Sequence, residues 1–69
     1  MPLAMTDIGQ IGLIKKIGGN VETKRFLESL GFVAGGKVTI VSKNHGNIIV
    51  NVKETRVALS SELANKIMV

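Results

Sequence analysis

The chain has 69 residues, a formal net charge of +4 and no cysteine. This length predicts one domain, residues 1–69, with a small core, and the lack of cysteine excludes disulfides and cysteine-based zinc sites. The first residues lack the basic stretch of a secretory signal. No apolar run approaches the roughly 20 residues of a membrane-spanning helix. We therefore expect a cytoplasmic domain that does not span the membrane.

The charge balance of nine Lys or Arg against five Asp or Glu favours acidic partners, such as nucleic acid, an anionic membrane or an acidic protein surface. The basic residues are scattered along the chain. Phe26 and Phe32 are the only aromatic residues, whereas binding of single-stranded nucleic acid usually needs several exposed rings. A small nucleic-acid-binding β-barrel is therefore the alternative to a protein-binding role.

The first part of the chain predicts an extended lead-in over residues 2–6, a turn over 7–10 and a strand over 11–17. Asp and Gly in the turn adopt the backbone conformations that turns require. Gly12 within the strand indicates either a bulge or a close approach of another segment.

A single short helix is predicted over residues 21–30. Asn20 is a good N-cap residue, and Phe26, Leu27 and Leu30 have the spacing of one apolar stripe. A helix of this length is marginal alone, so it must pack on the rest of the domain.

The stretch that follows the helix predicts a sharp stop and a turn. Gly31 stands where a Schellman motif needs a left-handed residue, which lets Phe32 fold back onto Leu27. Gly35 and Gly36 supply positive φ angles for a tight turn.

The rest of the chain predicts short strands joined by tight turns: strands over 37–43, 48–53 and 56–59, a hairpin loop over 44–47 and a connection at 54–55. The alternating pattern places Val38 and Ile40 on one face of the first of these strands and Thr39 and Val41 on the other. In the next two strands it predicts a set of inward aliphatic side chains: Ile48, Val50, Val52, Val57 and Leu59.

The chain is expected to end with a helical turn from Ser60 to Asn65, capped by Ser60, and a closing strand with Ile67 and Val69. The elements together predict a mainly β domain with one short helix, folded as a small β-barrel of about five strands.

The polar residues do not predict a catalytic site. His45 is the only histidine, and the carboxylates are spread over separate elements, so no acid–base pair or closed metal site is apparent. We therefore expect a binding module that is not an enzyme and has no cofactor. A weak divalent metal site with His45, completed by another subunit or by water, is an alternative.

The segment Arg25-Phe26-Leu27-Glu28-Ser29-Leu30-Gly31-Phe32-Val33-Ala34-Gly35 resembles the R-L-x-x-L-G-[LMF]-x-x-G core of the FeoA family. This family is the small cytosolic component of bacterial ferrous iron transport. The opening strand, the strand after the glycine turn and the closing segment are also similar to those of the family. The resemblance thus covers nearly the whole chain.

The resemblance implies an SH3-like barrel and a non-enzymatic accessory or regulatory protein of ferrous iron uptake. Its expected partner is the cytosolic GTP-binding domain of FeoB, the membrane iron permease. The same domain occurs at the C-terminus of iron-dependent repressors of the DtxR type, so a metal-responsive regulatory module is a further alternative. We expect a monomer or a weak homo-oligomer.

The candidate residues divide into two groups. Leu27, Leu30, Gly31 and Gly35 are expected to fold the domain. A separate set is expected to contact the partner, namely Arg25, Phe32, Val33 and His45.

Overall fold

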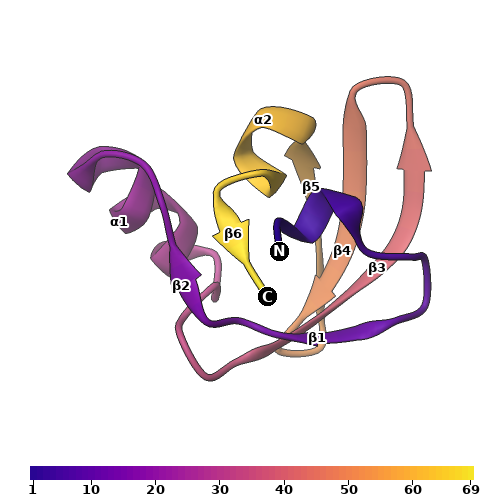
Figure 1. The fold of residues 1–69 in the computed structure, drawn as a ribbon, viewed down its shortest axis with the longest axis horizontal. Coiled ribbons are helices and arrows are strands. Elements are labelled where there is room, and N and C mark those ends of the chain that lie inside the picture. The colour runs from indigo at the N-terminus through magenta and orange to yellow at the C-terminus, as the bar shows by residue number, and fades with distance from the viewer.

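The computed structural model describes residues 1–69 and contains six strands, two α-helices and a short 3-10 helix (Figure 1). In chain order the elements are η1 (Leu3–Met5), β1 (Ile11–Leu13), β2 (Lys16–Ile17), α1 (Val21–Ser29), β3 (Lys37–Asn44), β4 (Asn47–Val52), β5 (Thr55–Ser60), α2 (Ser61–Ala64) and β6 (Ile67–Met68). Neither α-helix has the length and apolar character needed to cross a membrane.

The strands form two antiparallel sheets. A four-stranded sheet has the order β1-β3-β4-β5, and β2 pairs with β6 in a second, two-stranded sheet. The prediction of a mainly β domain is therefore confirmed. The hydrogen-bonded ladder does not close into one barrel, however, because the two sheets remain separate.

The first predicted strand is divided into β1 and β2, which belong to different sheets. The backbone N–H of Ile14 donates to Gly36 at 2.8 Å, whereas that of Lys15 donates to Met68 at 2.7 Å. The chain thus changes partner between these two residues. The prediction of a single strand over 11–17 was therefore wrong. The alternation of side chains along a strand does not show where the chain leaves one sheet and joins another.

Gly12 allows the close approach that the sequence indicated. A Cβ atom at this position would lie 3.1 Å from the Cγ1 atom of Val69, and the pairing of β1 with β3 is regular, without a bulge. Gly12 therefore lets the C-terminal residue pack directly on β1.

The segment before the first turn was predicted to be extended, but it contains a short helix. Residues Leu3–Met5 form η1, which buries Leu3. The Thr6 hydroxyl donates to the Leu3 carbonyl at 2.8 Å and so satisfies its own buried polar atom.

A bulge in β3 connects this N-terminal segment to the sheet. The register with β4 shifts between Ile40 and Ser42, after which Lys43 lies opposite the buried Ile48. The shift reverses the side to which Lys43 points. Its ammonium group therefore reaches the carbonyl oxygens of Ala4 at 3.2 Å and Thr6 at 2.8 Å.

The two hairpin connections differ from the prediction, the first in length and the second in position. The loop between β3 and β4 contains only His45 and Gly46. The loop between β4 and β5 is Lys53–Glu54, one residue earlier than expected, and both residues have positive φ angles, 49° and 63°. These are the angles of a type I′ turn. The sequence does not predict this turn, because Lys and Glu are not typical residues of a type I′ turn.

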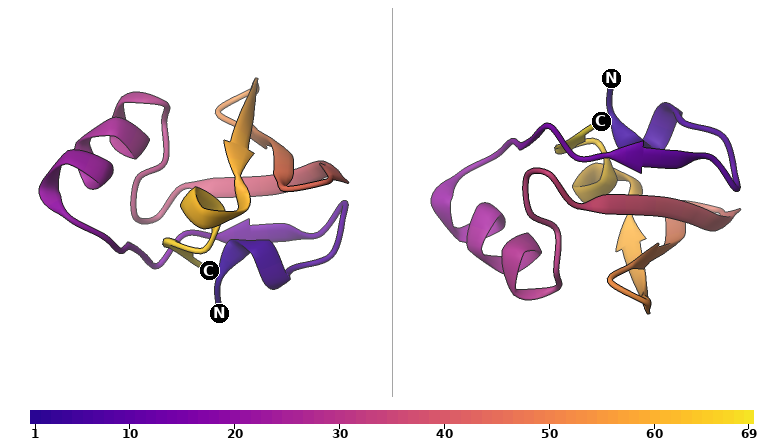
Figure 2. Two further views of the ribbon diagram at one scale, coloured as in Figure 1. Left: turned by 90° about the horizontal axis from the view of Figure 1, so that it is seen from above. Right: turned by 90° about the horizontal axis from the view of Figure 1, so that it is seen from below.

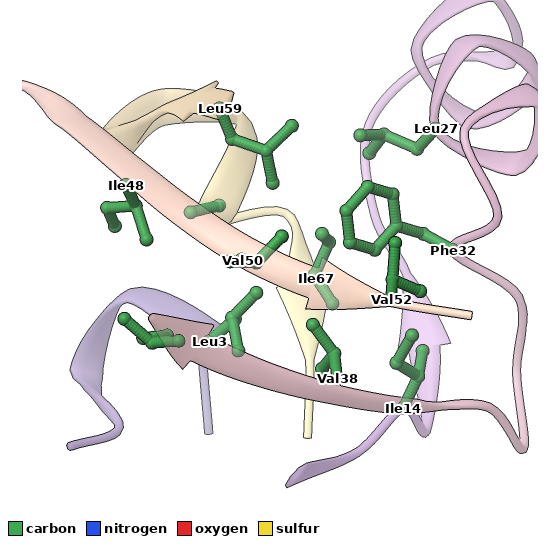
Figure 3. Close-up of a cluster of buried hydrophobic side chains, with 12 residues drawn as sticks. Leu3, Ile14, Leu27, Phe32, Val38, Ile48, Val50, Val52, Leu59 and Ile67 are labelled. Carbon is green, nitrogen blue, oxygen red and sulfur yellow. The ribbon is translucent and has the colours of Figure 1, made fainter. Parts of the chain in front are cut away.

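The core is a cluster of 12 buried apolar residues between the sheets, η1 and the helices (Figure 3). Val38 and Ile40, on one face of β3, are both buried. The predicted inward residues of β4 are all buried, and so is Leu59 of β5, whereas Val57 is half-buried. Figure 3 shows the ring of Phe32 between Leu27 of α1 and the cluster around Val52 and Ile67.

Candidate functional site

Helix α1 has defined ends at both termini, as the sequence predicted. The side chain of Asn20 accepts a hydrogen bond from the Thr23 N–H at 2.8 Å. At the other end, the N–H of Gly31 donates to Glu28 and that of Phe32 to Leu27, both at 3.0 Å. These two bonds and the φ of +107° at Gly31 define a Schellman motif.

Helix α1 packs against the rest of the domain through only a narrow part of its surface. Leu27 is fully buried and Leu30 is half-buried, whereas Phe26 is 51% exposed. The predicted apolar stripe therefore contains the two leucines but not Phe26. Successive helical residues are about 100° apart, so Phe26 lies on the flank of the helix, and Phe32 fills the core beside Leu27.

The outward side of α1 combines an apolar and a basic group. Val21 and Arg25 are four residues apart and lie on the same side of the helix, and both are exposed. Phe26, the next residue in the chain, is also exposed and lies about 100° around the helix from Arg25. We call these three residues, Val21, Arg25 and Phe26, the α1 surface. In the views of Figures 1 and 2, α1 stands at one end of the molecule, beside the sheets.

Phe32 and Val33, the apolar residues that follow α1, contribute little to this surface. Phe32 is fully buried, so its side chain offers no atoms to a partner in this structure. Val33 is half-buried. The Gly36 N–H closes the turn onto the Val33 carbonyl at 3.0 Å, with a φ of +88° at Gly35. Gly36 itself does not adopt the positive φ that was expected of it.

His45 lies far from the α1 surface. It is exposed in the two-residue turn between β3 and β4, and Figure 1 places this hairpin on the side of the molecule opposite α1. The structure therefore separates the sequence-predicted contact residues into two regions. His45 has no cluster of ligands around it, since no three His, Asp or Glu side chains lie close enough to hold a metal ion.

The sequence reasoning missed two members of the α1 surface, Val21 and Phe26. Val21 stands at the start of the predicted helix, outside the predicted apolar stripe, whereas Phe26 is part of that stripe. Its spacing from Leu30 fits a buried stripe equally well, so no local signal distinguishes the two placements. The structure contains no pocket, and the candidate site is therefore a surface.

Comparisons with known proteins place this chain in a family. A family model described as the FeoA domain matches residues 1–69. A protein of Methanocaldococcus jannaschii with the name "Putative Fe(2+) transport protein A" is 32% identical over 68 residues, which are 99% of this chain and 83% of that protein.

Solved structures agree with this match. The crystal structure of an iron uptake regulatory protein (FeoA) has a TM-score of 0.91 and 26% identity, with 99% of this chain and 92% of that chain covered. The FeoA of Stenotrophomonas maltophilia in complex with zinc, described as an SH3 domain protein, has a TM-score of 0.86 and 27% identity, with 99% and 87% covered.

A manganese-dependent transcriptional repressor has a TM-score of 0.88 at 21% identity over 97% of this chain and 39% of that chain, which shows a shared fold. The fold is thus SH3-like, although its sheets are not closed. The chain belongs to the FeoA family.

Proposed function

We propose that this protein is a non-enzymatic accessory protein of ferrous iron transport that binds the cytosolic GTP-binding domain of a FeoB-type permease. The observation that carries the proposal is the match of the FeoA model to residues 1–69, together with the transport function named for the Methanocaldococcus relative.

The α1 surface is the part of the structure that suits such a partner best. Arg and aromatic residues supply much of the binding energy in protein interfaces, and here Arg25 and Phe26 are adjacent and exposed. No side-chain hydrogen bond of the structure involves Arg25. The guanidinium group is therefore available to a carboxylate of the partner.

The proposal predicts that Arg25→Glu and Phe26→Ala each weaken binding of the permease's cytosolic domain at least about tenfold, because each removes a central contact. Isothermal titration calorimetry with the cognate domain, with and without guanine nucleotide, measures the effect. Arg56→Glu, the same charge reversal at an exposed position of β5 outside the α1 surface, is the matched control. It should retain binding within about threefold, since a charge outside the contact region affects only long-range attraction.

Two results would contradict this proposal. Absence of binding by the folded wild-type protein in both nucleotide states would remove the partner. Equal loss of affinity in the Arg56 and Arg25 variants would keep the partner but remove the α1 surface as the contact region.

A further inference from the structure

The exposed apolar side chains are concentrated at the beginning of the chain. The structure exposes seven large apolar side chains, and two of them, Val21 and Phe26, belong to α1. The others all come from residues 1–13: Met1, Met5, Ile8, Ile11 and Leu13. We call residues 1–13 the N-terminal layer. Figure 2 shows this layer, which contains η1 and β1, along one side of the molecule.

The backbone of β1 determines which of its side chains remain outside. Gly12 faces inward against Val69, so its neighbours Ile11 and Leu13 point to the other side of the strand. They are 68% and 56% exposed. Because β1 is an outer strand of the four-stranded sheet, no further strand pairs beyond it within that sheet.

The N-terminal layer is fixed to the body of the domain at several points. The Lys43 ammonium group binds the carbonyls of Ala4 and Thr6, and the Gly9 N–H donates to Ile40 at 2.9 Å. The apolar side chains are therefore presented from an ordered backbone, and a partner need not bear the entropic cost of ordering it.

Lysines accompany this apolar surface. Lys37 lies directly opposite Leu13 in the sheet, and Lys15 and Lys16 follow β1; all three are exposed. Asp7 is the only carboxylate within the N-terminal layer. The other four carboxylates lie on α1, on α2 and in the turn between β4 and β5.

We propose that the N-terminal layer docks onto the surface of an anionic lipid bilayer. Aliphatic side chains can enter the boundary between headgroups and acyl chains, while lysines extend their apolar stems and pair with lipid phosphates. Reversible attachment needs both contributions, since a small apolar contact alone is weak. This inference does not depend on the proposed function.

The charges distinguish a bilayer from the other candidate occupants. A two-fold contact between two copies would bring the same patch together and place Lys15, Lys16 and Lys37 against one another. Nucleic acid would satisfy the lysines through its phosphates but would give no partner to the aliphatic side chains. An anionic bilayer complements both the charge and the apolar groups.

Co-sedimentation with vesicles tests the proposal on the full chain. We expect binding to vesicles of phosphatidylglycerol and phosphatidylcholine in equal parts, weaker binding at high salt, and little binding to phosphatidylcholine alone. Changing Lys15, Lys16 and Lys37 to Gln should weaken binding about fivefold for each lysine removed. The double variant Ile11→Ser with Leu13→Ser should weaken it at least about tenfold.

Matched variants on α1 serve as controls. The double variant Val21→Ser with Phe26→Ser removes exposed apolar groups from α1, and Lys24→Gln removes a positive charge from the same helix. Binding of each variant to vesicles should stay within about threefold of wild type. The chain has no Trp, so Leu13→Trp introduces a single local probe. Its emission should shift to shorter wavelength on anionic vesicles as the ring leaves water, whereas that of Phe26→Trp should not.

Several outcomes would overturn the proposal. The proposal fails if the folded wild-type protein does not bind anionic vesicles at low salt. It also fails if the α1 controls lose as much binding as the variants of the N-terminal layer. A dimer in sedimentation velocity that the Ile11/Leu13 variant dissociates would assign the surface to a second copy. Salt-sensitive binding to duplex DNA or RNA without binding to vesicles would assign it to nucleic acid.

Discussion

At the scale of single residues, Gly31 determines how the helix and the following strand are joined. Its φ of +107° is accessible to glycine and costly for residues with a Cβ atom. This angle reverses the chain so that Phe32 enters the core beside Leu27. One backbone conformation therefore ends α1 and also places the aromatic ring of the core.

We expect Gly31→Ala to lower the free energy of unfolding by at least about 1–2 kcal/mol, because an L-residue is strained in this conformation. The added Cβ atom meets only the Lys53 and Val52 side chains, at 3.5 Å or more, so backbone strain and not collision causes the loss. Urea denaturation measures it. Gly18→Ala, at a glycine without positive φ, should change the free energy by about 0.5 kcal/mol or less; equal effects of both substitutions would contradict this explanation.

At the scale of elements, α1 is held by its inner side and leaves its outer side free. Two adjacent residues show the division, since Leu27 is fully buried and Phe26 is half-exposed. Burial near the end of the helix is sufficient here because the Asn20 cap and the Schellman motif fix both termini. The exposed side can therefore serve recognition without contributing much to stability.

This division predicts opposite results for neighbouring substitutions. Leu27→Ala should lower the free energy of unfolding by about 3 kcal/mol, and the milder Leu27→Val by about 1 kcal/mol, because both leave space in the core. Phe26→Ala should change it by about 0.5 kcal/mol or less, since alanine favours the helix. Thermal unfolding of the three variants measures the difference. A loss for Phe26→Ala as large as that for Leu27→Ala would show that the phenyl ring is structural.

A second element-scale feature is the attachment of the N-terminal layer through Lys43. Lys43→Met keeps most of the apolar stem but removes the ammonium group from the carbonyls of Ala4 and Thr6. We expect it to lower the free energy of unfolding by about 1–2 kcal/mol and to accelerate amide hydrogen exchange in η1. Lys37→Met, at an exposed lysine of the same strand, is the control; if the two variants are equally stable, the hydrogen bonds of Lys43 contribute nothing.

At the scale of the whole molecule, local signals predicted most of the fold. Alternation separated the two faces of β3 and identified the inward face of β4, and Asn20 and Gly31 marked the ends of α1. Long-range partners were not visible in the sequence, so neither the change of sheet after Leu13 nor the bulge that turns Lys43 toward the N-terminal layer could be derived. Both features depend on which segments meet in space.

The same distinction applies to the candidate site. The sequence indicated Arg25, which is exposed, but it also included Phe32, which the structure buries, and His45, which lies on another side. Phe26 and Val21 emerged only from the packing of α1. The pattern of a short helix shows its apolar content but does not decide which flank meets the core.

We propose that the α1 surface binds the cytosolic domain of a FeoB-type permease. The most direct test is a titration of the isotope-labelled protein with that domain, followed by amide NMR signals. We predict shifted or broadened signals in residues 21–26 and at Val33, with β5 little affected, and loss of these changes in Arg25→Glu. A bound complex whose perturbed signals lie elsewhere, with residues 21–26 unchanged, would contradict the account.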